Sequence, residues 1–117
     1  MRCVEDPTLV ERLAKQGTAL TVCPLSNIKL CVFDKMDAHN LGHLLEQGLK
    51  VTINSDDPAY FGGYMNTNFL ETFAATGMNA GHAYQLARNS FEGSFIDAVA
   101  RQRYIGQLDD TFASFAA

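Results

Sequence analysis

Apolar and polar residues alternate along the first half of the chain in a way that predicts two helices and two strands. The apolar positions of residues 6–16 recur at helical spacing, and a second helix-like stretch covers residues 36–47. Each stretch is followed by a glycine and then by a short β-branched run, first residues 18–23 and later residues 49–53. This order of helix, strand, helix and strand is typical of an α/β fold with a parallel sheet.

Both predicted strands end in a polar turn. Pro24-Leu25-Ser26-Asn27 follows the first strand, and Asn54-Ser55-Asp56-Asp57-Pro58 follows the second. In barrels and open parallel sheets the carboxyl ends of the strands carry the chemistry. We therefore expect the candidate site residues in these two turns.

The adjacent carboxylates Asp56 and Asp57 are the strongest chemical signal in the chain. Pro58 cannot continue a strand ladder, so the chain must turn directly after them. Neighbouring negative charges repel each other, and a metal ion, a basic residue or a shared proton would compensate the repulsion. The alternative is an Asx-rich turn with both carboxylates in water. The local sequence leaves both interpretations open.

Two motifs make a resemblance specific. Cys-Pro-x-Ser-Asn at residues 23–27 and Ser-Asp-Asp-Pro at residues 55–58, in this order and spacing, resemble the adenosine/adenine deaminase family of zinc-dependent purine aminohydrolases. The resemblance extends from about residue 2 to about residue 95 and includes the later run Leu-Ala-Arg-Asn-Ser-Phe. Residues 28–30 and 58–64 are most similar to the adenine deaminase branch.

The resemblance implies a fold of which this chain holds only a part. Family members are built on a (β/α)₈ TIM barrel, which takes about 250 residues. The chain has 117 residues and matches strands seven and eight with their flanking helices. We therefore expect residues 1–117 to be a single unit, a C-terminal fragment that forms an incomplete barrel.

The resemblance also implies roles for both carboxylates. Asp56 would be a zinc ligand and a catalytic residue that orients the attacking water, and Asp57 would bind the substrate through N7 of the purine ring. Zinc lowers the pKa of its bound water to near neutrality, and the resulting hydroxide attacks C6 of adenine to give hypoxanthine and ammonia. A fragment of a deaminase for adenosine or another aminopurine is the alternative, as is a non-catalytic structural fragment.

The other functional groups of the family have no counterpart in this chain. They are a His-x-His pair, a third histidine ligand, a proton-donating glutamate and a catalytic histidine that closes strand six. We therefore expect the isolated chain to retain no zinc and to be inactive.

Three histidines and a polar pair are weaker candidates. His39 and His43 are four residues apart and would chelate a metal from one helix face, but surface or capping roles are favoured. His82, near a predicted helix start, is expected to be structural. Ser26 and Asn27 either position the loop over the purine pocket or cap it, and capping is favoured.

A glycine pair follows the acidic motif. Gly62-Gly63 is not a phosphate loop, because no Lys-Ser/Thr follows it. One interpretation is a close turn over the purine pocket, with Tyr60, Phe61 and Tyr64 as its walls. The other is a simple turn before the next helix, and the sequence leaves both open.

The second half of the chain is predicted to be helical. Asn66 or Thr67 is a candidate cap for the first helix and Asn79 for the next, and a last helix is predicted over residues 95–108. Phe112 and Phe115 in the remaining tail are expected to pack on the body of the protein.

Composition and charge argue against a membrane-spanning segment and against nucleic acid as a partner. No apolar run approaches the roughly 18 residues of a membrane span, and a net charge of −4 without basic clusters argues against nucleic-acid binding. The chain has three cysteines, Cys3, Cys23 and Cys31, and none of them forms a Cys-x-x-Cys pair. This pattern indicates reduced thiols in a cytoplasmic protein, and Cys23 is expected to be a buried strand residue rather than a nucleophile.

Two parallel strands alone have exposed edges, which predicts a homo-oligomer. The alternative is a monomer closed by the terminal helices.

Overall fold

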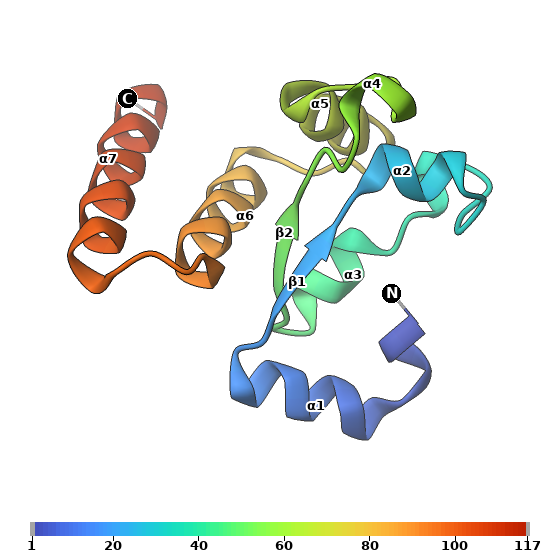
Figure 1. Ribbon diagram of the computed structural model, residues 1–117, viewed down its shortest axis with the longest axis horizontal. Coiled ribbons are helices and arrows are strands. Elements are labelled where there is room, and N and C mark those ends of the chain that lie inside the picture. The colour runs from blue at the N-terminus through green and yellow to red at the C-terminus, as the bar shows by residue number, and fades with distance from the viewer. Residues whose placement is uncertain (1, 117) are drawn as a thin grey trace.

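Two parallel strands lie at the centre of the computed structural model, which describes residues 2–116 (Figure 1). Strand β1 (Ala19–Val22) pairs with β2 (Lys50–Ile53) in a register that places Leu20 beside Val51. The chain passes from β1 to β2 through α2 (Pro24–Lys29), η2 (Met36–Ala38) and α3 (Leu41–Glu46). The predicted α/β class and the parallel pairing are confirmed.

Helices precede and follow this unit. The chain begins with η1 (Arg2–Glu5) and α1 (Pro7–Gln16). Four helices come after β2, namely α4 (Pro58–Phe61), α5 (Met65–Thr76), α6 (Ala80–Gly93) and α7 (Ala98–Ala116). No helix within residues 2–116 is long and apolar enough to cross a membrane.

Helix α1 begins and ends where its sequence signals predict. The Asp6 carboxylate accepts a hydrogen bond from the Leu9 amide at 3.2 Å, and Pro7 occupies the first turn. Gly17 ends the helix in the left-handed region at φ 65°, where a residue without a Cβ costs least.

The single helix predicted over residues 36–47 is wrong, because the chain breaks at His39. That residue is extended, with φ −66° and ψ 134°, and separates η2 from α3. Its Nδ1 atom accepts a hydrogen bond from the Leu41 amide at 3.1 Å, so the imidazole caps the start of α3. The break thus satisfies an amide that would otherwise lack an acceptor at the start of a helix.

One face of the sheet is apolar and the other is polar. Side chains alternate along a strand, so Val22, Val51 and Ile53 share the face that packs into the core. Leu41, Leu44 and Leu86 from α3 and α6 complete this core, together with Val10 and Leu49. On the opposite face, the Thr52 hydroxyl donates to the Leu20 carbonyl at 3.0 Å and accepts from Asn54 at 2.9 Å.

Helix α6 covers the outer edge of β2. The Asn89 side-chain amide donates to the Val51 carbonyl at 2.8 Å, and Lys50 forms an ion pair with Glu92 at 3.3 Å. Helix α7 packs against α6, which lies between α7 and the sheet (Figure 1). The terminal helices therefore cover one strand edge without closing over the whole sheet.

The predicted bounds of the last helices need correction. Helix α5 begins at Met65, before either proposed cap, Asn66 or Thr67. Helix α7 begins at Ala98, where the Asp97 carboxylate accepts the Ala100 amide at 2.7 Å, and it continues to Ala116.

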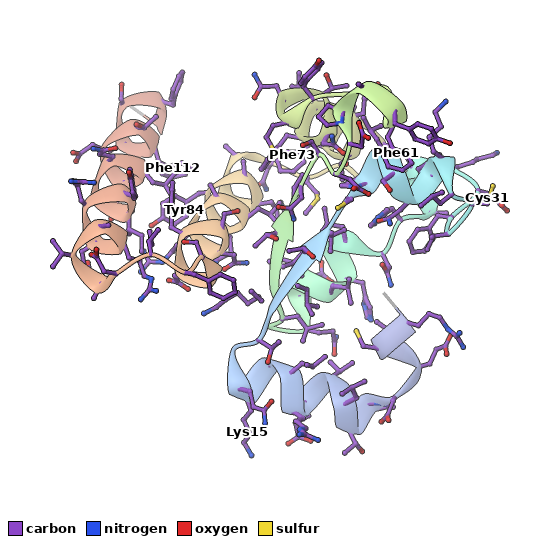
Figure 2. All side chains as sticks on the ribbon, viewed as in Figure 1. Lys15, Cys31, Phe61, Phe73, Tyr84 and Phe112 are labelled. Carbon is purple, nitrogen blue, oxygen red and sulfur yellow. The ribbon has the colours of Figure 1, made fainter. Side chains whose placement is uncertain are left out.

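The packing predicted for the tail is confirmed only for Phe112. Its ring contacts that of Tyr84 at a centroid distance of 5.0 Å, and the two side chains point toward each other between α6 and α7 (Figure 2). Phe115 is 87% exposed, so its predicted packing is wrong. Residue 117, the end of that tail, lies outside the described residues.

Candidate functional site at the carboxyl end of the sheet

The two polar turns predicted to carry the site meet at the carboxyl end of the sheet. The Ser26 hydroxyl donates a hydrogen bond to Asp56 Oδ2 at 2.9 Å and so links residues that are 30 positions apart. Helices α2, α4 and α5 gather at this end, with α1 beyond the opposite end of the strands (Figure 1). Each polar turn contains a short helix, α2 or α4, that the sequence did not predict.

Asp56 has a strained backbone. Its φ of 56° lies in the left-handed region, which is uncommon for a residue with a side chain, although aspartate tolerates it better than most. Such strain is frequent at functional sites, where surrounding contacts maintain it. Asp56 is exposed, and within residues 2–116 its Oδ1 atom has no hydrogen-bond partner. The second oxygen of this carboxylate is therefore accessible.

Asp57 has a different local role. Its Oδ1 atom accepts a hydrogen bond from the Tyr60 amide at 3.1 Å, so the side chain caps α4. Asp57 is also exposed, and neither aspartate forms an ion pair with a basic residue in the described part of the chain. The Asx-turn interpretation thus describes the local structure of Asp57, and both carboxylates are exposed.

Asn68 is a residue of this region that the sequence did not single out. Its side chain is fully buried in α5, and its Oδ1 atom accepts the Leu25 amide at 3.1 Å. Its Nδ2 atom donates to the carbonyls of Gly63 at 3.3 Å and Tyr64 at 3.0 Å. One side-chain amide therefore ties the turn after β1 to the turn between α4 and α5. In the sequence, Asn68 is one polar residue within a helical pattern, and nothing near it indicated that its side chain would link two turns.

Ser26 and Asn27 do not cap their helix, which corrects the favoured interpretation. Helix α2 has no side-chain hydrogen bond at its N-cap, Cys23. Ser26 instead binds Asp56, and Asn27 Oδ1 lies 3.0 Å from His39 Nε2. Because His39 Nδ1 accepts from the Leu41 amide, Nε2 carries the proton and donates to Asn27.

The histidines have the surface or capping roles that were favoured for His39 and His43, and the structural role that was expected for His82. Burial lowers the pKa of His39 to about 4, and both of its ring nitrogens are hydrogen-bonded. His43 is exposed on α3. His82 Nδ1 accepts the Asn79 amide at 3.0 Å while Asn79 accepts the His82 amide, so the capping role predicted for Asn79 is confirmed.

The glycine pair turns the chain and allows close packing. Gly62 ends α4 at φ 83°, and a Cβ on Gly63 would collide with the Leu25 side chain. Tyr60 and Tyr64 are 75% and 70% exposed. These contacts explain the glycines by turn geometry and packing, and the role of the aromatic side chains as pocket walls stays a prediction.

All three cysteines are free thiols. Cys23 lies directly after β1, and burial followed by the negative charge of Asp56 raises the pKa of its thiol. A raised pKa leaves less thiolate, which disfavours a nucleophilic role. Cys31 is exposed at the start of the loop between α2 and η2 (Figure 2).

The described residues contain no group of three or more His, Cys, Asp or Glu side chains that would hold a metal ion. Asp56 offers one accessible carboxylate oxygen, and a closed tetrahedral zinc site takes four ligands. These residues therefore fit a contribution of one ligand to a shared metal site, rather than a complete site.

Comparison with known proteins identifies a family and several relatives that the chain resembles in sequence. The sequence model of the family described as adenosine deaminase matches residues 1–111. An adenine deaminase from Albidiferax ferrireducens is 58% identical over 115 residues, and one from Geotalea uraniireducens is 56% identical over 116 residues. Each alignment covers 98% of this chain and 33% of the relative, so the chain spans about a third of the length of these proteins.

Solved structures of related proteins match the fold of this chain. The crystal structure of an adenine deaminase from Arthrobacter aurescens matches with a TM-score of 0.90 and 39% identity, over 93% of this chain and 33% of that one. An amidohydrolase from Burkhoderia ambifaria, solved with bound zinc, shares the fold with a TM-score of 0.78 at 24% identity, over 96% and 34% of the two chains. Because the family match covers nearly the whole sequence, this chain belongs to the adenosine deaminase family.

Proposed function

We propose that this chain supplies the two strand-end carboxylates of a zinc-dependent adenine deaminase, with Asp56 as a zinc ligand and Asp57 as a contact to the purine ring. The observation that carries the proposal is the cross-linked carboxyl end of two parallel strands, where Asp56 presents an accessible oxygen. The 58% and 56% identical relatives named adenine deaminase support adenine over adenosine as the substrate.

The proposal includes the architecture. Strands β1 and β2 would be the seventh and eighth strands of a (β/α)₈ barrel, with residues 1–117 as one structural unit of it. The parallel register and the position of the acidic turn support this assignment, since barrel enzymes carry their chemistry at the carboxyl ends of the strands.

The two carboxylates would divide the work. A bound zinc supplies activation of a water molecule. Asp56 offers Oδ1 to the cation while Ser26 holds Oδ2. Asp57 uses one oxygen to cap α4, which leaves the other for a hydrogen bond to a ring nitrogen, with one proton shared between the two groups. Because Asp56 is the only match to the ligand set of the family, the chain by itself is expected to be inactive.

Complementation tests the proposal. The chain is co-expressed with the part of the Albidiferax ferrireducens adenine deaminase that it does not match, and the purified complex is assayed with adenine and with adenosine by ultraviolet absorbance. We expect turnover of adenine by the complex and none by either part alone. Turnover of adenosine but not of adenine would identify adenosine as the substrate. Turnover by the isolated chain that vanishes in Asp56→Ala would refute the expected inactivity of the chain.

Variants of the complex separate the roles of the two aspartates. Asp56→Ala is expected to lower both the zinc content and the rate, whereas Asp57→Ala leaves zinc nearly intact and lowers the rate and substrate binding. Asp57→Asn is the matched control, because asparagine caps a helix as well as aspartate does. A full rate in Asp57→Asn with a reduced rate in Asp57→Ala would show that Asp57 acts only as a helix cap and does not contact the substrate. Equal zinc loss in both alanine variants would contradict the division.

We also propose that the isolated chain forms homo-oligomers through the edge of β1 that faces away from β2. Within residues 2–116 this edge has no strand partner, and such edges recruit other strands. Light scattering at micromolar concentration tests this. A monodisperse species with the mass of one chain would exclude it.

A further inference from the structure

The hydrogen bond between Ser26 and Asp56 joins a buried group to an exposed one. Ser26 lies in the first turns of α2 and is only 2% exposed, whereas Asp56 faces solvent. The hydroxyl donates to Oδ2 at 2.9 Å. A buried donor on a rigid element therefore fixes one end of an exposed carboxylate.

This contact makes the two oxygens of the carboxylate unequal. A carboxylate in water rotates freely and offers either oxygen to a cation. With Oδ2 engaged by Ser26, rotation about both the Cα–Cβ and the Cβ–Cγ bonds is restricted, and Oδ1 is the atom without a protein partner among residues 2–116. The left-handed backbone of Asp56, at φ 56°, fixes the direction from which the side chain leaves the chain.

We propose that Ser26 is a positioning residue, whose hydroxyl orients the Asp56 carboxylate so that Oδ1 alone is presented to a divalent cation. The inference rests on the proposed function, in which Asp56 ligates zinc. Groups that orient a metal ligand through hydrogen bonds typically contribute about 10- to 100-fold in metal affinity.

The neighbouring residue provides a matched control. Asn27 belongs to the same helix and also makes a side-chain hydrogen bond to another segment, but its partner is His39 and not Asp56. Asn27→Ala therefore removes a cross-link of similar kind and leaves the carboxylate contact intact. A general loosening of α2 would affect both variants, whereas positioning of Asp56 is specific to Ser26→Ala.

The first test needs neither metal nor substrate. Nuclear magnetic resonance couplings of the full chain report the φ and χ1 angles of Asp56. We expect one φ and one χ1 rotamer in the wild type and in Asn27→Ala, and rotamer averaging in Ser26→Ala. An unchanged rotamer distribution in Ser26→Ala would overturn the inference.

A reciprocal variant keeps the test decisive if Ser26→Ala fails to fold. Asp56→Asn retains an oxygen that accepts from Ser26, and asparagine tolerates the left-handed region. We expect the Asn side chain to keep a single rotamer. Averaging in this variant would show that Ser26 does not hold the side chain, and would overturn the inference.

The second test measures zinc affinity in the complemented complex by competition with a chelator. We expect Ser26→Ala to weaken zinc binding by about tenfold or more, and Asn27→Ala to change it by less than about twofold. If Asp56→Ala weakens zinc binding but Ser26→Ala does not, the positioning role fails and the proposed function stands. If Asp56→Ala leaves the affinity unchanged, the proposed function fails, and the metal-directed role of Ser26 fails with it.

Discussion

The buried His39 should make the stability of the protein depend on pH. Its imidazole is 6% exposed, donates through Nε2 to Asn27 and accepts through Nδ1 from the Leu41 amide. Protonation would place a charge in the interior and an N–H group opposite the Leu41 N–H group. The folded state therefore requires a neutral ring, and burial lowers the pKa of His39 from 6.5 to about 4.

The sign and size of the effect follow from proton linkage. The unfolded chain takes up a proton near pH 6.5 and the folded chain only near pH 4, so the neutral ring stabilises the fold above pH 6.5. This stabilisation is lost progressively as the pH falls from 6.5 to about 4, and no further loss occurs below that. At about 1.4 kcal/mol per pH unit the shift amounts to about 3 kcal/mol, of which about 2 kcal/mol disappears between pH 7 and pH 5.

Urea unfolding followed by circular dichroism at pH 7, 6 and 5 measures this loss. His39→Asn keeps a side-chain acceptor for the Leu41 amide but does not titrate, so its unfolding free energy should fall by about 2 kcal/mol less than that of the wild type over this range. His43→Asn, at an exposed position of α3, should retain the wild-type dependence. Equal pH dependence in wild type and His39→Asn would refute the reasoning, as would an imidazole titration midpoint of His39 near 6.5.

Three further packing predictions are open to the same unfolding measurement. Asn68→Ala should lower the unfolding free energy by about 3 kcal/mol, since it leaves the Leu25 amide and two carbonyls without their partner; a loss below about 1 kcal/mol would contradict this. Gly63→Ala should lower it by about 1–3 kcal/mol through the collision with Leu25, whereas Gly106→Ala, with open space around the new Cβ inside α7, should raise it by about 0.5–1 kcal/mol. Asn89→Ala should lower the unfolding free energy by about 1–2 kcal/mol by removing the donor to the Val51 carbonyl, and an unchanged urea midpoint would exclude that role.

Features that depend on a few neighbouring residues could be predicted from the sequence. Asp6 and Asn79 accept amides three positions ahead, which is the distance over which a helix cap acts. The same signal was present but missed at Asp57, where an aspartate followed by proline caps α4 as Asp6 followed by Pro7 caps α1. The polar turn was therefore correctly located, and its short helix was not.

Features that depend on distant residues could not be predicted. At the break, the His39 ring also donates to Asn27, 12 positions away, and the link between Ser26 and Asp56 spans 30 positions. The role of Asn68 depends on an amide 43 positions earlier. Local propensity favours a continuous helix over residues 36–47 and a simple capping role for Ser26. Both expectations failed because tertiary hydrogen bonds outweighed those local preferences.

The energetics of Asp56 show how a long-range contact offsets local backbone strain. A left-handed backbone at a residue with a side chain costs about 1–3 kcal/mol, and a hydrogen bond to a charged group contributes about 1.5–3 kcal/mol. The bond from the buried Ser26 hydroxyl is therefore of the size required to offset the strain of Asp56. Both partners lie within residues 2–116, so the orientation of the carboxylate is set before any further ligand or cation arrives. An exposed oxygen held in this way needs little reorganisation on binding a cation, which is the property that the proposed zinc-ligand role of Asp56 requires.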